Sequence, residues 1–307
     1  MATAYVSHPV FKEHVMSEGH PDSPGRLTSI EDRLQADGIM DFLMYHDAPL
    51  ATRTQLERAH SARHVETLSA QAPDRGLIRI DPDTYMGPRT LEAAWRAAGA
   101  AVLAVDLVMT GQVASAFCAV RPAGHHAERN AAMGFCFFCN TAVAACHAMD
   151  RFGLDRVAIV DFDVHHGNGT EDIFRDDPRV LVCSIYQHPL YPYAGNRSVP
   201  GHIVNVPVPP GTAGRAWQQA ITEKWLPALD EFRPQLVIVS AGFDGHAADP
   251  MAELLLTEAD YAWVTEQLSS VSERHAGGRL VSCLEGGYDL AALGRCVAIH
   301  IRRLAGW

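Results

Sequence analysis

Long hydrophobic runs are missing from this sequence of 307 residues. No stretch approaches the roughly 18 consecutive apolar residues that a membrane-spanning helix needs, so we expect no membrane span. The formal net charge of -11 argues against an anionic membrane as a partner. The first eight residues contain no basic region followed by an apolar stretch, which predicts that no signal peptide is present. Internal repeats, low-complexity tracts and linkers rich in Ser and Gly are also absent, so we expect one domain over residues 1–307.

Positive charge is scarce, and the cysteines show no pairing pattern. The 25 Lys and Arg residues face 36 Asp and Glu residues, for a formal net charge of -11, which argues against binding to nucleic acid. Seven cysteines lie scattered in apolar contexts, as expected for a protein of the reducing cytoplasm. Cys136 and Cys139 form a CxxC motif, but no second CxxC exists, so we expect two packed structural thiols rather than a zinc ribbon or a redox pair.

The chain alternates between apolar strands and amphipathic helices. Between Pro88 and Met109, for example, apolar residues recur every three or four positions, which predicts a helix. The other expected helices cover residues 27–36, 56–70, 140–152, 215–232 with a kink at Pro227, 257–275 and 289–304, and the expected strands cover residues 4–6, 114–120, 156–162, 179–185, 203–206, 235–241 and 279–284. This alternation predicts an α/β fold of three layers, in which helices flank a mainly parallel central sheet.

One segment, from Val157 to Thr170, combines a buried strand with a group of acids and histidines. Residues two apart in an extended segment point the same way, so Asp161, Asp163 and His165 are expected to share one face. Burying two carboxylates and an imidazole together costs several kcal/mol unless a partner neutralises them. A divalent cation is the simplest such partner, so the segment predicts a metal site.

Polar residues are found at the ends of four expected strands. The four segments are Arg121-Pro-Ala-Gly-His-His126, Asp161-Phe-Asp-Val-His165, Gly242-Phe-Asp244 and Glu285-Gly-Gly-Tyr288. In open parallel sheets, ligands bind outside the carboxyl ends of the strands. We therefore expect the four segments to meet in one cleft.

The residues of this cleft are typical of metal-assisted hydrolysis. Asp163, His165 and Asp244 supply two oxygens and one nitrogen and leave a fourth position for water, which is the layout of a catalytic zinc site. An oxygen-rich set of this kind also suits ferrous iron. His125 and His126 are candidates for the general base and acid.

Three more polar residues have positions that suit supporting roles in the cleft. Asp161 can hold one imidazole in its tautomer, and Asn168 can orient the other. Tyr288 follows a flexible Gly-Gly turn, from which it can donate a hydrogen bond to a developing oxyanion.

At these motifs the chain resembles the histone deacetylase family of zinc-dependent amidohydrolases, which has the arginase/deacetylase fold. Matching segments run from His20 to Tyr288. The resemblance implies a role for each cleft residue: zinc ligand for Asp163, His165 and Asp244, general base and acid for His126, its electrostatic partner for His125, histidine-orienting group for Asp161 and Asn168, and transition-state stabiliser for Tyr288. Asn168, preceded by His125-His-Ala-Glu128, is similar to the class II branch and its bacterial members.

The resemblance also implies a substrate tunnel and structural potassium. Phe135 and Tyr191 match the aromatic walls of an acyl-lysine tunnel, and Gly134, Met251 and Gly286 belong to the same region. Asp83 and Arg26 match, more loosely, a rim acid and an inner-cavity arginine. The residues that match the family's potassium sites are Asp161, Asp163, His165, Ser184 and Ile185 for the first site and Phe174 for the second.

The expected reaction is hydrolysis of an acetyl-lysine-type amide, in a peptide or protein, to acetate and a free amine. Three alternatives remain open at this point. A binuclear manganese ureohydrolase on the same fold would need further acids beside Asp244; an acetylpolyamine or another small amide or ester would change the substrate only; and a catalytically silent acyl-lysine binding module would not need His126 or Tyr288. Family members selective for acetylpolyamines can have Glu where this chain has Met251, which favours acyl-lysine.

Overall fold

The fold is built on one eight-stranded sheet in which every pairing is parallel. A computed structural model describes residues 2–195 and 197–307. The strands lie in the order β2 (Leu43–Asp47), β1 (Thr3–Ser7), β5 (Ser115–Cys118), β10 (Leu280–Leu284), β9 (Leu236–Ala241), β6 (Val157–Asp161), β7 (Val180–Gln187) and β8 (Ile203–Val208). The predicted α/β class with a mainly parallel central sheet is confirmed. Parallel strands need crossover connections, and among the described elements helices supply them everywhere except between β7 and β8.

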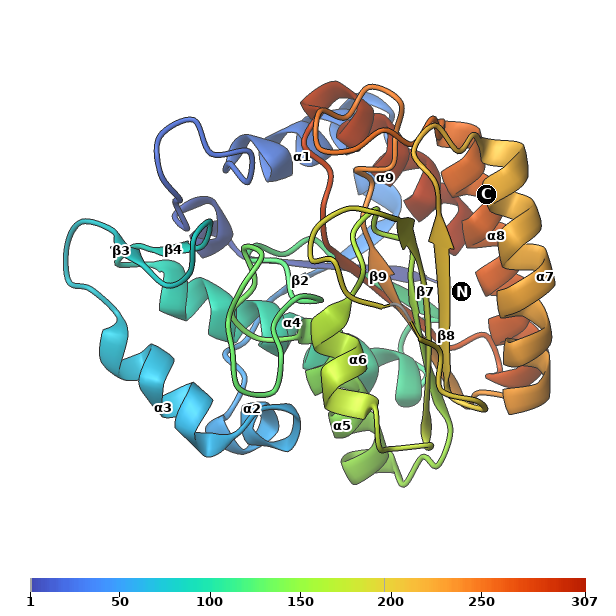
Figure 1. Ribbon diagram of the computed structural model, residues 1–307, viewed down its shortest axis with the longest axis horizontal. Coiled ribbons are helices and arrows are strands. Elements are labelled where there is room, and N and C mark those ends of the chain that lie inside the picture. Colours follow the sequence, from blue (N-terminus) through green and yellow to red (C-terminus); the bar gives the residue numbers. More distant parts are fainter. Residues whose placement is uncertain (1, 196) are drawn as a thin grey trace.

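Helices cover both faces of the sheet, so the architecture has three layers (Figure 1). One layer contains α1 (Gly25–Ala36), α7 (Gly214–Phe232), α8 (Glu258–His275) and α9 (Leu290–Leu304). The other contains α2 (Arg53–Ala59), α3 (Ala62–Gln71), α4 (Thr90–Met109), α5 (Asn140–Phe152) and the short α6 (Asn168–Phe174). Two 3-10 turns (Pro9–Lys12 and Met40–Phe42) and a small hairpin of β3 (Ile78–Arg79) and β4 (Tyr85–Met86) complete the described elements.

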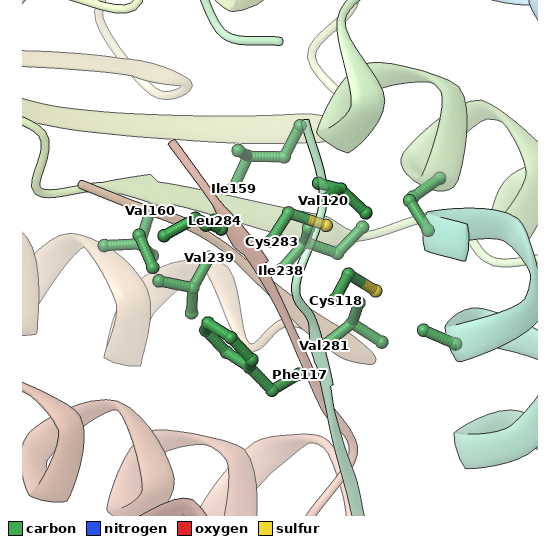
Figure 2. Packing of buried hydrophobic residues seen from close by; sticks show 14 of the residues in the cluster. Phe117, Cys118, Val120, Ile159, Val160, Ile238, Val239, Val281, Cys283 and Leu284 are labelled. Atoms are coloured by element: carbon green, nitrogen blue, oxygen red, sulfur yellow. The ribbon is translucent and has the colours of Figure 1, made fainter. Parts of the chain in front are cut away.

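The core is formed where the four middle strands, β5, β10, β9 and β6, lie side by side. Figure 2 shows side chains from these strands packed together, among them Phe117, Ile159, Val239 and Val281. All four are fully buried, and removing such a side chain from water contributes about 1.5–3 kcal/mol each. The strands are therefore held rigidly, and their carboxyl ends start from fixed positions.

Most predicted elements are present, with two notable differences. The predicted helix over residues 56–70 is wrong: α2 ends before His60, whose backbone is extended, and the hydroxyl of Ser61 accepts a hydrogen bond from the His64 amide to begin α3. Strand β2 was not predicted, because it is an exposed edge strand without a buried face. A capping box begins α8, since Asp260 accepts from the Thr257 amide at 2.8 Å.

Pro227 lies inside α7, which continues to Phe232. In the described part of the chain, no helix combines the length and the apolar character needed to cross a membrane.

Candidate metal centre and active site

The four polar segments expected to meet in one cleft do lie together. They follow β5, β6, β9 and β10, which are neighbours in the sheet. Two backbone hydrogen bonds join the segments directly: the Val164 amide donates to Oδ1 of Asp244 at 2.9 Å, and the Gly286 amide donates to Oδ2 of Asp163 at 2.8 Å. The backbone that follows β6 thus fixes the carboxylate after β9, and the backbone that follows β10 fixes the carboxylate after β6.

Asp163, His165 and Asp244 form one compact, buried cluster. Their ligand atoms all lie within 4.8 Å of one another. Nδ1 of His165 lies 3.0 Å from Oδ1 of Asp163 and 3.2 Å from Oδ2 of Asp244. The three residues come from the ends of β6 and β9, so the rigid sheet sets their spacing.

The cluster fits a divalent cation on its own chemistry. Oδ2 of Asp244 is buried and accepts no well-aligned hydrogen bond within the described residues, although Nδ1 of His165 lies 3.2 Å away. Burial, together with the charge of Asp163, raises the pKa of Asp244 to about 7. Two facing buried carboxylates repel each other unless a positive charge lies between them. Two oxygens and one nitrogen with a free fourth position match a catalytic zinc site.

Two glycines make room for the carboxylates. A Cβ atom at Gly242 would lie 2.0 Å from Oδ2 of Asp163, and one at Gly286 would lie 2.0 Å from Oδ2 of Asp244. Neither position can accept a side chain without displacing a carboxylate of the cluster. Gly286, predicted for the substrate tunnel, is packed against the carboxylates of the cluster and is not among the residues that line the cavity described below.

The two histidines of the pair have different partners. Nδ1 of His125 lies 2.9 Å from Oδ2 of Asp161, and Nδ1 of His126 lies 2.7 Å from Oδ1 of Asn168. The amide nitrogen of Asn168 donates to Oε1 of Glu128 at 2.8 Å, which fixes the oxygen of Asn168 toward His126. His126 therefore donates from Nδ1, and its Nε2 keeps a free lone pair.

The surroundings of the two histidines shift their pKa values in opposite directions. Burial lowers the pKa of His126 well below its usual range, and the neighbouring His125 and His165 lower it further. Burial also opposes the charged form of His125, but the carboxylates of Asp161 and Asp163 outweigh it and raise the pKa of His125. A neutral imidazole beside a charged one is the arrangement that base and electrostatic partner require.

A narrow cavity of about 150 Å³ leads to the cluster. Its lining residues come from seven separate positions along the chain: Asp83, His126, Gly134 with Phe135, His165, Tyr191, Met251 and Tyr288. The structure thus brings the predicted tunnel residues Gly134, Phe135, Tyr191 and Met251 to the same cavity as His126 and Tyr288.

Aromatic rings form the cavity walls. The rings of Phe135 and Tyr288 meet edge to face with centroids 6.1 Å apart, and Tyr191 meets His126 in the same way at 5.2 Å. Gly134 has a φ of 56°, and a Cβ there would lie 2.5 Å from Cδ2 of His126. Glycine at this position therefore lets the aromatic wall approach the histidine closely.

Two buried charged residues support the site through backbone atoms: Glu285, for which the sequence predicted no role, and Arg26, which matched an inner-cavity arginine of the family. Glu285 accepts the backbone amides of Gly124 at 2.7 Å and His125 at 3.1 Å, so it positions the histidine segment. Arg26 donates to the carbonyl of Gly287 at 2.6 Å, and its guanidinium lies 4.9 Å from the ring centre of Tyr288. Glu285 could have been found as the acid that directly follows β10, whereas Arg26 is distant in sequence.

A buried ion pair holds Arg26 in place. Asp22 accepts from Nη1 of Arg26 at 2.8 Å and from Nε and Nη2 of Arg121 at 2.8 and 3.0 Å. All three side chains are nearly inaccessible. The residues that match the potassium sites are buried too: Ser184 pairs in register with Asp161 across β6 and β7, Ile185 follows it, and Phe174 ends α6.

The chemistry of the cysteine motif and of a second cluster argues against further metal centres there. Cys136 and Cys139 are free and fully buried, and burial raises the pKa of both thiols. His246, Glu258 and Cys296 also lie within reach of one ion. However, Nδ1 of His246 accepts the Ala248 amide at 3.0 Å, so the proton of the neutral ring is on Nε2, the nitrogen nearest Glu258. A protonated nitrogen is not a metal ligand.

A parallel α/β sheet whose strand ends carry an Asp-His-Asp cluster and a histidine pair is typical of metal-dependent hydrolases. The histone deacetylase domain matches residues 20–304, and this chain belongs to the histone deacetylase family. It is therefore a hydrolase of the deacetylase and amidohydrolase type, with the arginase/deacetylase fold. The family expected from the sequence motifs is confirmed.

Several known proteins are similar over most of this chain. The histone deacetylase-like amidohydrolase of Pseudomonas aeruginosa is 40% identical over 297 residues, which cover 94% of this chain and 77% of that protein. The polyamine deacetylase HDAC10 of Mus musculus is 38% identical over 302 residues, which cover 93% of this chain and 45% of that protein. The crystal structure of the HDA15 HD domain has a TM-score of 0.92 and 33% identity, and covers 99% of this chain and 90% of that one.

Proposed function

We propose that this protein is a zinc-dependent deacetylase that hydrolyses the amide of an acetyl-lysine side chain. The observation that carries the proposal is the narrow aromatic cavity. His126, Tyr288 and the metal-ligand candidate His165 all line this cavity. Membership of the deacetylase family supports the reaction type, and the cavity supports a substrate with a long thin stem. We also propose that residues 1–307 form a single domain.

Asp163, His165 and Asp244 would hold the metal ion. A zinc ion bound there lowers the pKa of a water molecule to about 7 and polarises a carbonyl, and ferrous iron can do the same in an oxygen-rich set. Because the three side chains leave one side open toward the cavity that His165 lines, a substrate carbonyl can approach from there. Among the described residues, the site contains one group of possible metal ligands and no second group beside it. This favours a site for one ion over a binuclear centre.

His126 is the general base in this proposal. Its Nδ1 is held by Asn168, so Nε2 is free to accept the proton of the attacking water. His125 keeps its proton through Asp161 and remains the positive partner beside it. The contribution of Asp161 persists when a cation neutralises Asp163. A histidine of the pair then protonates the leaving amine, which releases acetate.

Tyr288 donates a hydrogen bond to the oxyanion of the tetrahedral intermediate. Burial raises the pKa of Tyr288 well above its usual range, so the phenol keeps its proton at neutral pH. Donors of this kind, placed where negative charge develops, supply a large part of the rate enhancement. A catalytically silent binding module would have no need for this group or for a free Nε2 on His126.

The cavity walls select the substrate. Phe135 and Tyr191 can flank the methylene stem of an acyl-lysine and leave only the acyl group at the base. Met251 lies in the wall where a carboxylate would attract a cationic polyamine, and Met offers no charge. Acetylpolyamine remains the second candidate substrate, because a polyamine deacetylase is among the similar proteins.

Structural potassium and a reducing location complete the proposal. The main chain around Asp161, Asp163, His165, Ser184 and Ile185, and that around Phe174, would provide carbonyl oxygens for potassium ions. Seven free cysteines fit a reducing compartment such as the cytoplasm.

Hydrolysis profiles with metal analysis of the same sample test the proposal. We expect one zinc or iron ion per chain and faster hydrolysis of acetyl-lysine peptides than of acetylpolyamines. No turnover of any amide by metal-loaded protein would refute the deacetylase proposal, and two ions per chain would favour the binuclear alternative.

A further inference from the structure

One buried carboxylate, Asp249, is hydrogen-bonded to two walls of the cavity at once. Its Oδ2 accepts the backbone amide of Tyr288 at 2.6 Å and that of Asp289 at 3.0 Å. Its Oδ1 accepts the backbone amide of Met251 at 3.0 Å. Asp249 is only 7% exposed, and it lines no part of the cavity itself. The two atoms of one carboxylate therefore connect the segment of Tyr288 with that of Met251.

The segment that carries Tyr288 needs such support. It follows Gly286 and Gly287, and Gly287 has a φ of 122°, a conformation that L-residues rarely adopt. Arg26 holds this turn from one side, through the carbonyls of Glu285 and Gly287. Asp249 holds it from the other side, through the amides of Tyr288 and Asp289. Both the carbonyl groups and the amide groups of this flexible turn are therefore held by buried side chains.

We propose that Asp249 is a positioning residue, which sets the place of the Tyr288 phenol and couples it to the Met251 wall that contacts the substrate. This inference rests on the proposed function, since it assumes that Tyr288 acts on the reacting amide. Asp249 itself touches neither substrate nor metal in this proposal. It acts because a hydrogen-bond donor in an oxyanion site loses its effect when it is displaced by as little as about 1 Å.

The two oxygens of Asp249 can be tested separately. In Asp249→Ala both sets of hydrogen bonds are lost. In Asp249→Asn the remaining oxygen is best used by the two donors of Tyr288 and Asp289, which leaves the amide NH₂ facing the Met251 amide, donor against donor. We therefore expect Asp249→Asn to raise KM with kcat within about threefold of the wild type, whereas Asp249→Ala lowers kcat by about tenfold or more.

A double-mutant cycle separates positioning from general stability. The four proteins are wild type, Asp249→Ala, Tyr288→Phe and the double variant, assayed with a trifluoroacetyl-lysine peptide, whose activated amide keeps slow turnover measurable. We expect Asp249→Ala to cost about tenfold in kcat/KM in the wild-type background but less than about threefold in the Tyr288→Phe background. Equal losses in both backgrounds would overturn the inference while leaving the deacetylase proposal standing.

Two further results complete the test. A Tyr288→Phe protein with wild-type turnover would refute the role of Tyr288 itself, a pattern distinct from equal losses. Asp260→Ala is the matched control, because Asp260 is also a buried carboxylate that accepts a backbone amide, from Thr257. Within the described residues, its side chain hydrogen-bonds to Thr257 and Gln218 and to no segment of the cavity. We expect Asp260→Ala to lower the melting temperature with little change in kcat. Two outcomes would contradict a positioning role. One is a similar loss of kcat in Asp249→Ala and Asp260→Ala. The other is a loss of kcat in Asp249→Ala alone, without the rise in KM expected for Asp249→Asn.

Discussion

Nδ1 of His126 lies 2.7 Å from the side-chain oxygen of Asn168, a neutral acceptor that places no negative charge beside the histidine. Burial and the nearby His125 and His165 lower the pKa of His126. Because the base must be unprotonated, a lowered pKa keeps it active at lower pH. We expect the acidic limb of the kcat/KM profile to lie below pH 6.5, the ordinary value for histidine.

Replacing that neutral acceptor by a carboxylate should move the acidic limb to higher pH. Asn168→Asp must be combined with Glu128→Gln, because the amide of Asn168 now donates to Glu128 and two facing carboxylates would repel each other. A carboxylate beside His126 favours its protonated form, so the limb should rise by about one pH unit or more. Glu128→Gln alone is the control, since its side chain can still accept from Asn168. An unmoved limb in the double variant would show that His126 is not the titrating base.

His126→Ala should abolish most turnover and leave the fold and the metal content intact. The histidine belongs to neither the metal cluster nor the hydrophobic core, so its loss removes a proton acceptor without removing a ligand. General-base catalysis contributes about 10²- to 10⁴-fold, and we expect kcat to fall within that range. Assays with an acetyl-lysine fluorogenic peptide, metal analysis and a thermal melt of the same sample provide the measurement. Near-normal activity would disprove the assigned role.

Chelation should remove activity and lower stability together. Without a cation, Asp163 and Asp244 face each other in a buried site, and the folded chain loses the free energy of metal binding. A dialysed, metal-free sample should melt at a lower temperature and regain activity with about one equivalent of zinc. Asp244→Asn is the matched comparison: it removes the repulsion as well as a ligand, so its melting temperature should respond far less to chelator. Equal responses of the two proteins would argue against this cluster as the metal site.

Met251→Glu should shift substrate preference toward acetylpolyamines. Met251 lies partly exposed in the cavity wall, and a carboxylate there would attract a secondary ammonium group on a polyamine stem. We expect the ratio of kcat/KM for acetylpolyamine to that for acetyl-lysine peptide to rise by about tenfold, an effect of about 1.4 kcal/mol. Met251→Gln, with similar length and no charge, is the control. An equal shift in both variants would assign the effect to shape rather than to charge.

The sequence correctly predicted which side chains lie together where those side chains directly follow a buried strand. Buried strands such as β6 and β9 are continuous apolar runs, and the acids and histidines at their ends reach the site directly. The edge strand β2 lacked this signal, since most of its side chains are exposed. Arg26 and Asp249 were harder to interpret because their partners, Gly287 and Tyr288, come from another part of the chain. Their roles follow from backbone atoms, which residue types do not reveal.

Gly286→Ala should damage the metal site more than its small size suggests. The added Cβ would lie 2.0 Å from Oδ2 of Asp244 and 2.6 Å from Oδ2 of Asp163, so at least one carboxylate must move. The backbone here is not in the left-handed region, and the effect is therefore steric rather than conformational. Gly25→Ala is the control, because its Cβ would meet only ordinary contacts at 3.4 Å. We expect Gly286→Ala to weaken zinc binding by about tenfold or more in a competition titration, as other changes to groups that orient metal ligands do. Wild-type affinity in this variant would show that the carboxylates are not held against Gly286 when the metal is bound.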